Sequence, residues 1–218
     1  LLASSAASDV YKRQDKNIVS FIFLLRQKRF MWRLKMDSGN IGFVLLCAAF
    51  VFVMTPGLAM FYGGLVRKKN VVNTMMTSIF IIGIGIVMWV LFGYSLSFAP
   101  SGNAFIGDFR WLGLEGVSLT EGYTDDASIP NMVFSAFQMM FAVITPALIT
   151  GAVAGRMKFK SIFVFTIFWS LIVYYPLAHM VWGQGGLLGA DGIGALDFAG
   201  GDVVHISSGV SALVLCIL

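Results

Sequence analysis

The sequence predicts an all-α membrane protein with five transmembrane helices. Of its 218 residues, 58% are hydrophobic and 12% are charged, whereas a soluble domain carries a charged fraction of about 25%. The apolar residues gather in long blocks, and a membrane-spanning helix needs roughly 20 of them in succession. Asp197, Asp202 and His205 lie at the mouth of or inside the last block. Ionisable residues in such a place are costly to insert and mark transport paths or proton relays.

A short basic turn separates the first two expected spans. Residues from about 41 to 66 are almost wholly apolar, and Arg67, Lys68 and Lys69 end this block. The second span is expected at about 71–98, before a long polar loop from Ala99 to Pro130. Because the connection between the two spans is so short, we expect them to be antiparallel neighbours.

Three further spans follow the polar loop. The third is expected at about 131–155 and the fourth at about 162–182, again with a short basic turn between them. The fifth is expected at about 198–218, after a glycine-rich connection that begins at Gly183. Each block is near the length of roughly 17–25 residues that a membrane helix requires.

Residues 1–35 are expected to be a disordered leader outside the membrane domain. Much of the positive charge lies there, and the apolar run from Ile18 to Leu25 is too short to span a bilayer. Met36 is a plausible start, so we expect the leader to derive from a translated upstream segment. At the other end, Leu218 lies inside an apolar run, and we expect that run to be cut short there.

Loop charges predict the orientation. The turns 67–69 and 156–160 are basic, whereas the loop from Ala99 to Pro130 carries five acidic residues against Arg110 alone. The positive-inside rule places the basic turns in the cytoplasm of a cell (plasma) membrane. The start of the first span, the acidic loop and Asp197 are then expected outside.

His205 and Asp197 are the first candidates for chemistry. His205 follows Asp197 by eight residues, which places it roughly 12 Å deeper along the helix. An imidazole near the bilayer midplane can donate and accept hydrogen bonds and exchange a proton, although a structural histidine bridging two helices is an alternative. Asp197 can cap the helix, attract a cation, or do both.

Aromatic residues are the second group of candidates. Trp182 ends the fourth span, either as an ordinary interfacial tryptophan or as a cation–π platform for an ion that must bind weakly. Phe137 and Phe141 share a face of the third span at a spacing of four residues. Phe141 lies at a depth similar to that of His205, where a ring can gate a narrow path, although contact with lipid is the commoner role. His179 lies one turn before Trp182 and is expected to be an ordinary residue of the membrane–water interface.

Other functional classes find no support in the sequence. No nucleotide-binding loop, metal-ligand cluster or nucleophile elbow is present, so we expect no enzyme, no cofactor and no metal site. Nucleic acid is not an expected partner because most of the basic excess belongs to the leader. Cys47 and Cys216 lie inside apolar runs and are expected to be free thiols.

Three motifs carry a resemblance to a known family. The segments 61–70 (FYGGLVRKKN), 178–183 (AHMVWG) and 197–205 (DFAGGDVVH) closely resemble the ammonium transporter (Amt/MEP/Rh) family, in the right order and on the right helices. The likeness covers residues 36–218 and is nearest to bacterial members. It implies that the five spans form the first inverted repeat of an eleven-helix fold.

The resemblance also implies roles for single residues. Trp182 corresponds to the aromatic platform of the outer ammonium site, and Phe141 to one of two stacked gate phenylalanines. His205 corresponds to the first of two pore histidines, and Asp197 to the signature aspartate near the outer site. Asp202 receives no role.

The implied function is transport of ammonium, which is deprotonated so that ammonia passes an apolar pore. The alternative is an ammonium sensor of the same fold. The implied partners are ammonium or ammonia, the lipid bilayer, two further copies in a homotrimer and a regulator of the PII type on the cytoplasmic side. The fragment alone is expected to be inactive because the second repeat supplies the rest of the pore.

Overall fold

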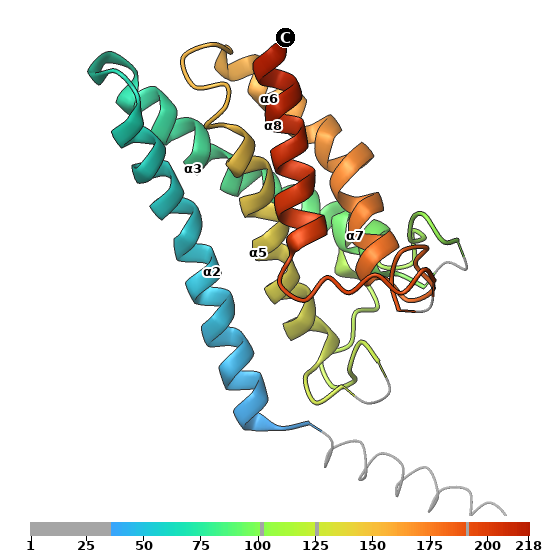
Figure 1. The fold of residues 1–218 in the computed structure, drawn as a ribbon. Coiled ribbons are helices and arrows are strands. Elements are labelled where there is room, and N and C mark those ends of the chain that lie inside the picture. Colours follow the sequence, from blue (N-terminus) through green and yellow to red (C-terminus); the bar gives the residue numbers. More distant parts are fainter. Residues whose placement is uncertain (1–35, 101–102, 125–126, 191) are drawn as a thin grey trace, which may run out of the picture.

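The computed structural model describes residues 36–100, 103–124, 127–190 and 192–218. Within these ranges the chain is helical and contains no strand. The helices form a bundle with two ends (Figure 1). One end holds the short turns and the C-terminus, and the other holds the long loops. The expected leader at residues 1–35 lies outside the described residues.

The first described helix, α2 (Ser38–Leu65), lies at the edge of the bundle. Asp37 caps it by accepting a hydrogen bond from the backbone N–H of Asn40 at 3.0 Å. The helix is apolar throughout, yet buries only Thr55, Ala59 and Gly63. It packs on α3 (Val71–Met88) and α5 (Asn131–Ile149), so most of its apolar surface is open to lipid or to further protein.

Two membrane-length helices are interrupted by a π-helical turn. The segment Lys68–Phe98 joins α3, the π-turn η2 (Trp89–Gly93) and α4 (Tyr94–Phe98). The segment Phe159–Trp182 joins α6 (Phe159–Trp169), the π-turn η4 (Ser170–Tyr174) and α7 (Tyr175–Trp182). The parts of both segments at and after the π-turns share a buried aromatic cluster of Trp89, Tyr94, Phe98 and Tyr175, with ring centroids 5.6–6.1 Å apart.

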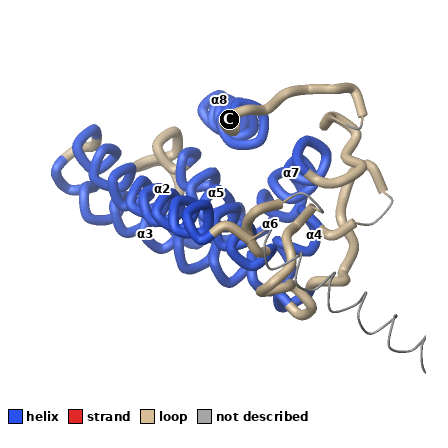
Figure 2. The backbone as a smooth tube through the Cα atoms, turned by 90° about the horizontal axis from the view of Figure 1, so that it is seen from below, coloured by secondary structure: helices blue, strands red, loops and turns tan. Residues whose placement is uncertain are grey.

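The fifth apolar helix consists of the π-turn η5 (Gly201–Ile206) and α8 (Ser207–Ile217). It packs on α5 and stands at the edge of the bundle (Figure 2). Four helices of the described chain are long and apolar enough to cross a membrane, while Gly201–Ile217 is shorter. The expectation of a fifth span therefore stays a prediction.

Several helix bounds differ by a few residues from those expected from the sequence, and two of these differences have a local cause. α5 ends at Ile149 rather than near residue 155. Thr150 closes the helix because its hydroxyl donates to the Ala147 carbonyl at 2.7 Å. Turns then lead to Gly155, whose positive φ of 73° ends any helical continuation. The last helix begins at Gly201 rather than at residue 198, because Gly200 is left-handed with φ 76°.

The long loops are tied to the helix ends. The Asp37 N–H donates to the Ser128 carbonyl at 3.0 Å, which joins the start of α2 to the end of the 99–130 loop. The Leu187 N–H donates to the Ala104 carbonyl at 2.9 Å and joins the two loops to each other. These bonds hold the loops against the end of the bundle where Trp182 lies.

Candidate functional site

One groove brings together four of the five predicted site residues. It has a volume of about 580 Å³ and lies where α5, α7 and the segment before η5 meet. Phe137 and Phe141 reach it from α5, Trp182 from the end of α7 and Asp197 from the connecting segment. The other lining residues are Tyr123, Phe134, Gln138, Phe198, Ala199 and Gly200.

Aromatic rings form most of the wall of this groove. The rings of Phe137 and Phe141 meet edge to face, with centroids 5.0 Å apart and an interplanar angle of 86°. The rings of Tyr123 and Phe134 are stacked at 4.9 Å and 6°. A ring face that its partner ring does not cover is electron-rich and attracts cations.

Tyr123 fixes the polar rim of the groove. Its hydroxyl accepts a hydrogen bond from the Gln184 backbone N–H at 3.1 Å, and its carbonyl accepts one from Gln184 Nε2 at 3.0 Å. Burial raises the pKa of Tyr123 to about 12, partly offset by the bond from Gln184. The phenol is therefore a neutral part of the rim at physiological pH.

Three lining aromatic residues, Phe134, Tyr123 and Phe198, were not predicted as site residues from the sequence. Phe134 precedes Phe137 by three residues, so helical spacing could have placed both on one face. Tyr123 lies in an irregular loop, and no local pattern connects it with a helix more than fifty residues further along the chain.

Asp197 caps the last helix with both carboxylate oxygens. Oδ1 accepts from the Gly201 N–H at 2.6 Å, and Oδ2 accepts from the N–H groups of Asp202 and Val203 at 3.1 Å each. Backbone N–H groups at a helix start have no partner within the helix. The cap interpretation of Asp197 is thus realised in full, and the carboxylate faces the helix while its residue lines the groove.

His205 lies apart from the groove lining. It belongs to the π-turn η5, where its N–H donates to the Gly200 carbonyl at 3.0 Å, and its side chain is exposed. Two and three residues further on, Ser207 and Ser208 are buried and donate to the carbonyls of Val203 and Val204 at 2.5 and 2.6 Å. A serine hydroxyl that donates to a carbonyl of the preceding turn is engaged there and is not poised as a nucleophile.

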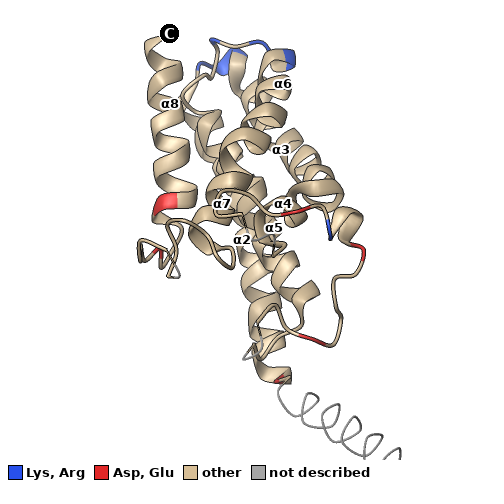
Figure 3. Ribbon diagram, turned by 90° about the vertical axis from the view of Figure 1, so that its right-hand side faces the viewer, with Lys and Arg blue, Asp and Glu red and all other residues tan. Residues whose placement is uncertain are grey.

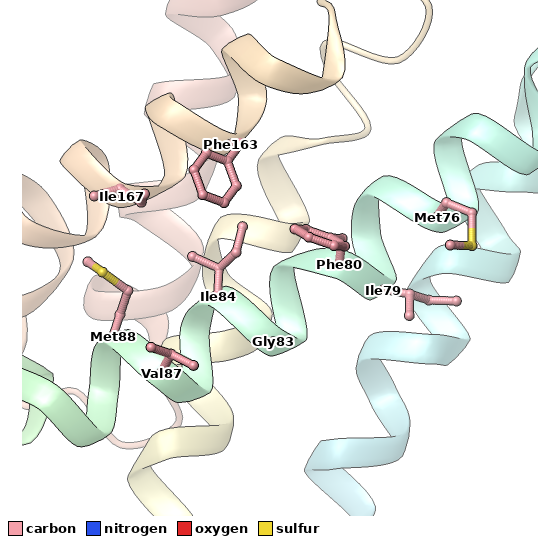
Figure 4. A pocket seen from close by; sticks show the side chains of 9 residues that line it. All are labelled: Met76, Ile79, Phe80, Gly83, Ile84, Val87, Met88, Phe163 and Ile167. Atoms are coloured by element: carbon pink, nitrogen blue, oxygen red, sulfur yellow. The ribbon is translucent and has the colours of Figure 1, made fainter.

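A second groove, of about 470 Å³, lies between α3 and α6 and has a different character. Figure 4 shows that only apolar side chains and one glycine line it. It has no polar side chain beside its two aromatic rings, Phe80 and Phe163, whereas the first groove combines its aromatic rings with Asp197 and Gln138. Within the described residues, no group of three or more His, Cys, Asp or Glu side chains could hold a metal ion.

Comparison with known proteins identifies the family. The sequence model of the Ammonium Transporter Family matches residues 42–218. The chain belongs to the ammonium transporter family. The resemblance inferred from the three motifs is therefore confirmed, and membership places the chain among transport proteins rather than enzymes.

Sequence relatives in the ammonium transporter family come from distant organisms. The ammonium transporter of Bacillus subtilis (strain 168) is 53% identical over 183 residues, which are 84% of this chain and 44% of the relative. Ammonium transporter 1 of Dictyostelium discoideum is 44% identical over 184 residues, or 83% of this chain and 39% of the relative. The chain thus spans less than half the length of the relatives it matches.

Solved structures of the family share the fold. Mep2 of Saccharomyces cerevisiae matches with a TM-score of 0.75 at 34% identity, covering 86% of this chain and 41% of the other. Mep2 of Candida albicans matches with a TM-score of 0.75 at 33% identity, covering 84% and 39%. A structure described as a sensor Amt protein matches with a TM-score of 0.70 at 28% identity, covering 82% and 43%. The predicted all-α membrane class is confirmed.

Proposed function

We propose that this chain supplies the outer binding site and the first part of the path of an ammonium transporter. The observation that carries the proposal is the groove, because it gathers Trp182, Phe137 and Phe141 from two helices beside Asp197. Membership of the family supplies the cargo. Since the chain covers 44% of its Bacillus subtilis relative, transport is proposed for the whole protein rather than for this chain alone.

An aromatic groove suits a cation that must bind and leave again. A cation over an aromatic ring gains about 0.5–2 kcal/mol, depending on how far it is desolvated. A carboxylate would hold the ion more firmly, but both oxygens of Asp197 are engaged by backbone N–H groups. We therefore assign the platform to Trp182, while Asp197 contributes negative charge and fixes the helix start.

Deprotonation explains how such a path would select ammonium. Potassium has a similar size and charge but no proton to give up, and a bare ion is very costly to bury in an apolar path. Neutral ammonia avoids that cost. We assign gating to Phe141 and Phe137, and proton exchange to His205, because an imidazole can both donate and accept a proton. The exposed face of His205 leaves it open to the part of the protein that completes the path.

The charge distribution supports an orientation across the membrane. Figure 3 shows basic residues at the end of the bundle with the short turns and acidic residues towards the other end. Arg110, the basic residue among the outer loops, pairs with Asp108 at 3.2 Å. The positive-inside rule then places the basic turns in the cytoplasm and the groove outside.

The wider assembly follows from the family resemblance. We propose a plasma-membrane homotrimer surrounded by lipid, with a PII-type regulator on the cytoplasmic side. The exposed apolar length of α2 and α8 is compatible with contacts to lipid or to further protein.

Uptake of methylammonium tests the proposal. The full-length protein is produced in cells that lack their own ammonium transporters, and Trp182→Ala with His205→Ala is compared with the wild type and with Leu119→Ala. Leu119 is an exposed loop residue outside the groove. We expect the double variant to lose uptake and the Leu119 variant to retain it. Undiminished uptake in the double variant would contradict the site assignment.

A sensor is the second candidate because one matching structure is described as a sensor Amt protein. The same cells separate the two functions. A transporter shows ammonium-dependent flux through the wild-type protein. A sensor binds ammonium at the groove, and loses that binding in Trp182→Ala, without comparable flux.

A further inference from the structure

His179 makes two polar contacts whose chemistry is unusual. The residue is fully buried in the last turn of α7. Its Nδ1 lies 3.1 Å from the Ser97 carbonyl oxygen, and its Nε2 lies 2.9 Å from the Asn103 carbonyl oxygen. Both ring nitrogens therefore face atoms that only accept hydrogen bonds.

A neutral imidazole satisfies only one of these contacts. In either tautomer one nitrogen carries a proton and the other presents a lone pair. The lone pair would then face a carbonyl oxygen at about 3 Å, where two acceptors repel each other. Only the imidazolium, with a proton on both nitrogens, donates to both carbonyls.

The surroundings favour a positive charge. Ser97 lies in the last turn of the helical segment Lys68–Phe98, and His179 lies in the last turn of Phe159–Trp182. Carbonyls at helix C-terminal ends lack partners within the helix and carry partial negative charge. The ring nitrogens thus meet two carbonyls, that of Ser97 at the C-terminal end of one helix and that of Asn103 in the loop, and the ring itself lies in the last turn of a second helix.

His179 forms no ion pair with a described residue, although η5, which packs on α7, carries Asp202 and His205. The stretches 94–98, 103–107, 175–182 and 183–189 contain no Asp, Glu, Lys or Arg. Their titratable groups besides His179 are the phenols of Tyr94 and Tyr175. The carbonyl oxygens are therefore the groups that would stabilise the cation.

The ring is held close to the end of the helix that carries Trp182. The His179 carbonyl accepts the Gly183 N–H at 2.9 Å. A Cβ on Gly183 would come within 2.6 Å of His179 Nδ1, so the chain turns tightly around the ring immediately after Trp182. Moving the ring would move the end of α7 and the outer loop together.

We propose that His179 is an imidazolium that joins the outer ends of α4 and α7 to the loop at Asn103, and thereby positions Trp182 for the outer site. This role rests on the proposed function. His179 acts through Trp182 and does not itself contact ammonium, so it is a positioning residue.

Nitrogen NMR tests the protonation state independently of transport. The full-length protein with ¹⁵N-labelled histidine is placed in lipid bilayers at pH 7.5, where a solvent-exposed imidazole is mostly neutral. The difference from a His179→Gln sample isolates the two ring nitrogens of His179. We expect two protonated nitrogens. One protonated and one bare nitrogen would overturn the proposal.

Ser97→Ala is the matched control for the spectrum. It removes a buried hydroxyl that has no hydrogen-bond partner but keeps the carbonyl that accepts from the ring. The imidazolium signature should persist in this variant. Its loss would show that the carbonyl contact does not hold the proton, and would also overturn the proposal.

Methylammonium uptake tests the positioning role. His179→Gln offers a donor to one carbonyl only, and we expect the half-saturation concentration to rise about tenfold as Trp182 shifts. His179→Lys restores a cation with several donors and should recover most of the affinity. Gln behaving like the wild type, or Lys behaving no better than Gln, would contradict the role. A wild type without any uptake would instead contradict the proposed function, while the NMR result still stands.

Discussion

At the scale of single residues, Asp197 shows how a carboxylate is accommodated at the start of an apolar helix. Three N–H groups of the first turn would otherwise lack partners, and the carboxylate accepts from all of them. An unsatisfied buried donor costs about 1–3 kcal/mol. The residue therefore stabilises the start of η5 whether or not it also attracts a cation.

The cap can be separated from the charge by substitution. Asp197→Ala removes every acceptor and should destabilise the protein by about 2 kcal/mol, whereas Asp197→Asn keeps one acceptor oxygen and should cost roughly half as much. Thermal unfolding in detergent measures both. Asp202→Ala is the control because Asp202 contributes only its backbone N–H to the cap. Equal losses at Asp202 and Asp197 would contradict the cap as the cause.

Tyr123 gives a prediction for alkaline pH. Burial raises its pKa to about 12, above the ordinary value of 10, so the folded state favours the neutral phenol. Its contribution to stability is fully present below pH 10 and is lost as pH rises through 12. The phenolate absorbance that distinguishes the wild type from Tyr123→Phe should therefore appear near pH 12. A difference that titrates near pH 10 would show that the phenol is solvated.

At the scale of secondary structure, apolar block length and basic turns were enough to predict the approximate positions of the four membrane-length helices. Helix interiors were not predictable, because the π-turns at Trp89–Gly93 and Ser170–Tyr174 leave the apolar pattern unchanged. The chain turns away after α5 with Gly155 at positive φ, and η5 begins after Gly200, which also has positive φ. Sequence shows that a glycine is present, but not which glycine the fold uses to turn.

In the candidate site, residues within local motifs could be predicted from the sequence, whereas a residue placed by a long-range contact could not. The sequence indicated Trp182, Phe141, Phe137 and Asp197 through motifs and spacing, and the fold brings them to one groove. Tyr123 reaches that groove through hydrogen bonds to Gln184, across 61 residues of sequence. Such a pairing depends on how the outer loops fold and has no local signature.

Close packing at Gly93 gives a prediction for the π-turn η2. A Cβ added there would lie 2.7 Å from the Tyr175 ring, which is fully buried in the aromatic cluster. Gly93→Ala should therefore force the two interrupted helices apart and destabilise the protein by about 1–3 kcal/mol. Gly83→Ala, on the same continuous helix but with no atom within 4 Å of its added Cβ, should be nearly neutral. Unfolding in detergent compares them, and similar stabilities for both would contradict tight packing at η2.

At the scale of the whole molecule, the two ends of the bundle differ in charge and in architecture. The end with short turns carries basic residues (Figure 3), namely Arg67, Lys68, Lys69, Arg156, Lys158 and Lys160. The groove is lined by residues of the long loops and of the helix ends beside them. The long loops are structured enough to contribute residues to the groove. By the positive-inside rule, the short basic turns are expected to stay in the cytoplasm. The proposed direction of ammonium entry follows from this asymmetry.

Labelling from one side of the membrane tests that direction. With Cys47 and Cys216 replaced by alanine in the full-length protein, Glu121→Cys and Lys158→Cys each introduce a thiol at an exposed position, at the loop end and the basic end respectively. A membrane-impermeant maleimide should label Glu121→Cys in intact cells and Lys158→Cys only after permeabilisation, because basic turns are retained in the cytoplasm. The reverse pattern would place the aromatic groove inside the cell. In that case Trp182 would face the side that ammonium leaves, and uptake driven by binding at this groove would be untenable.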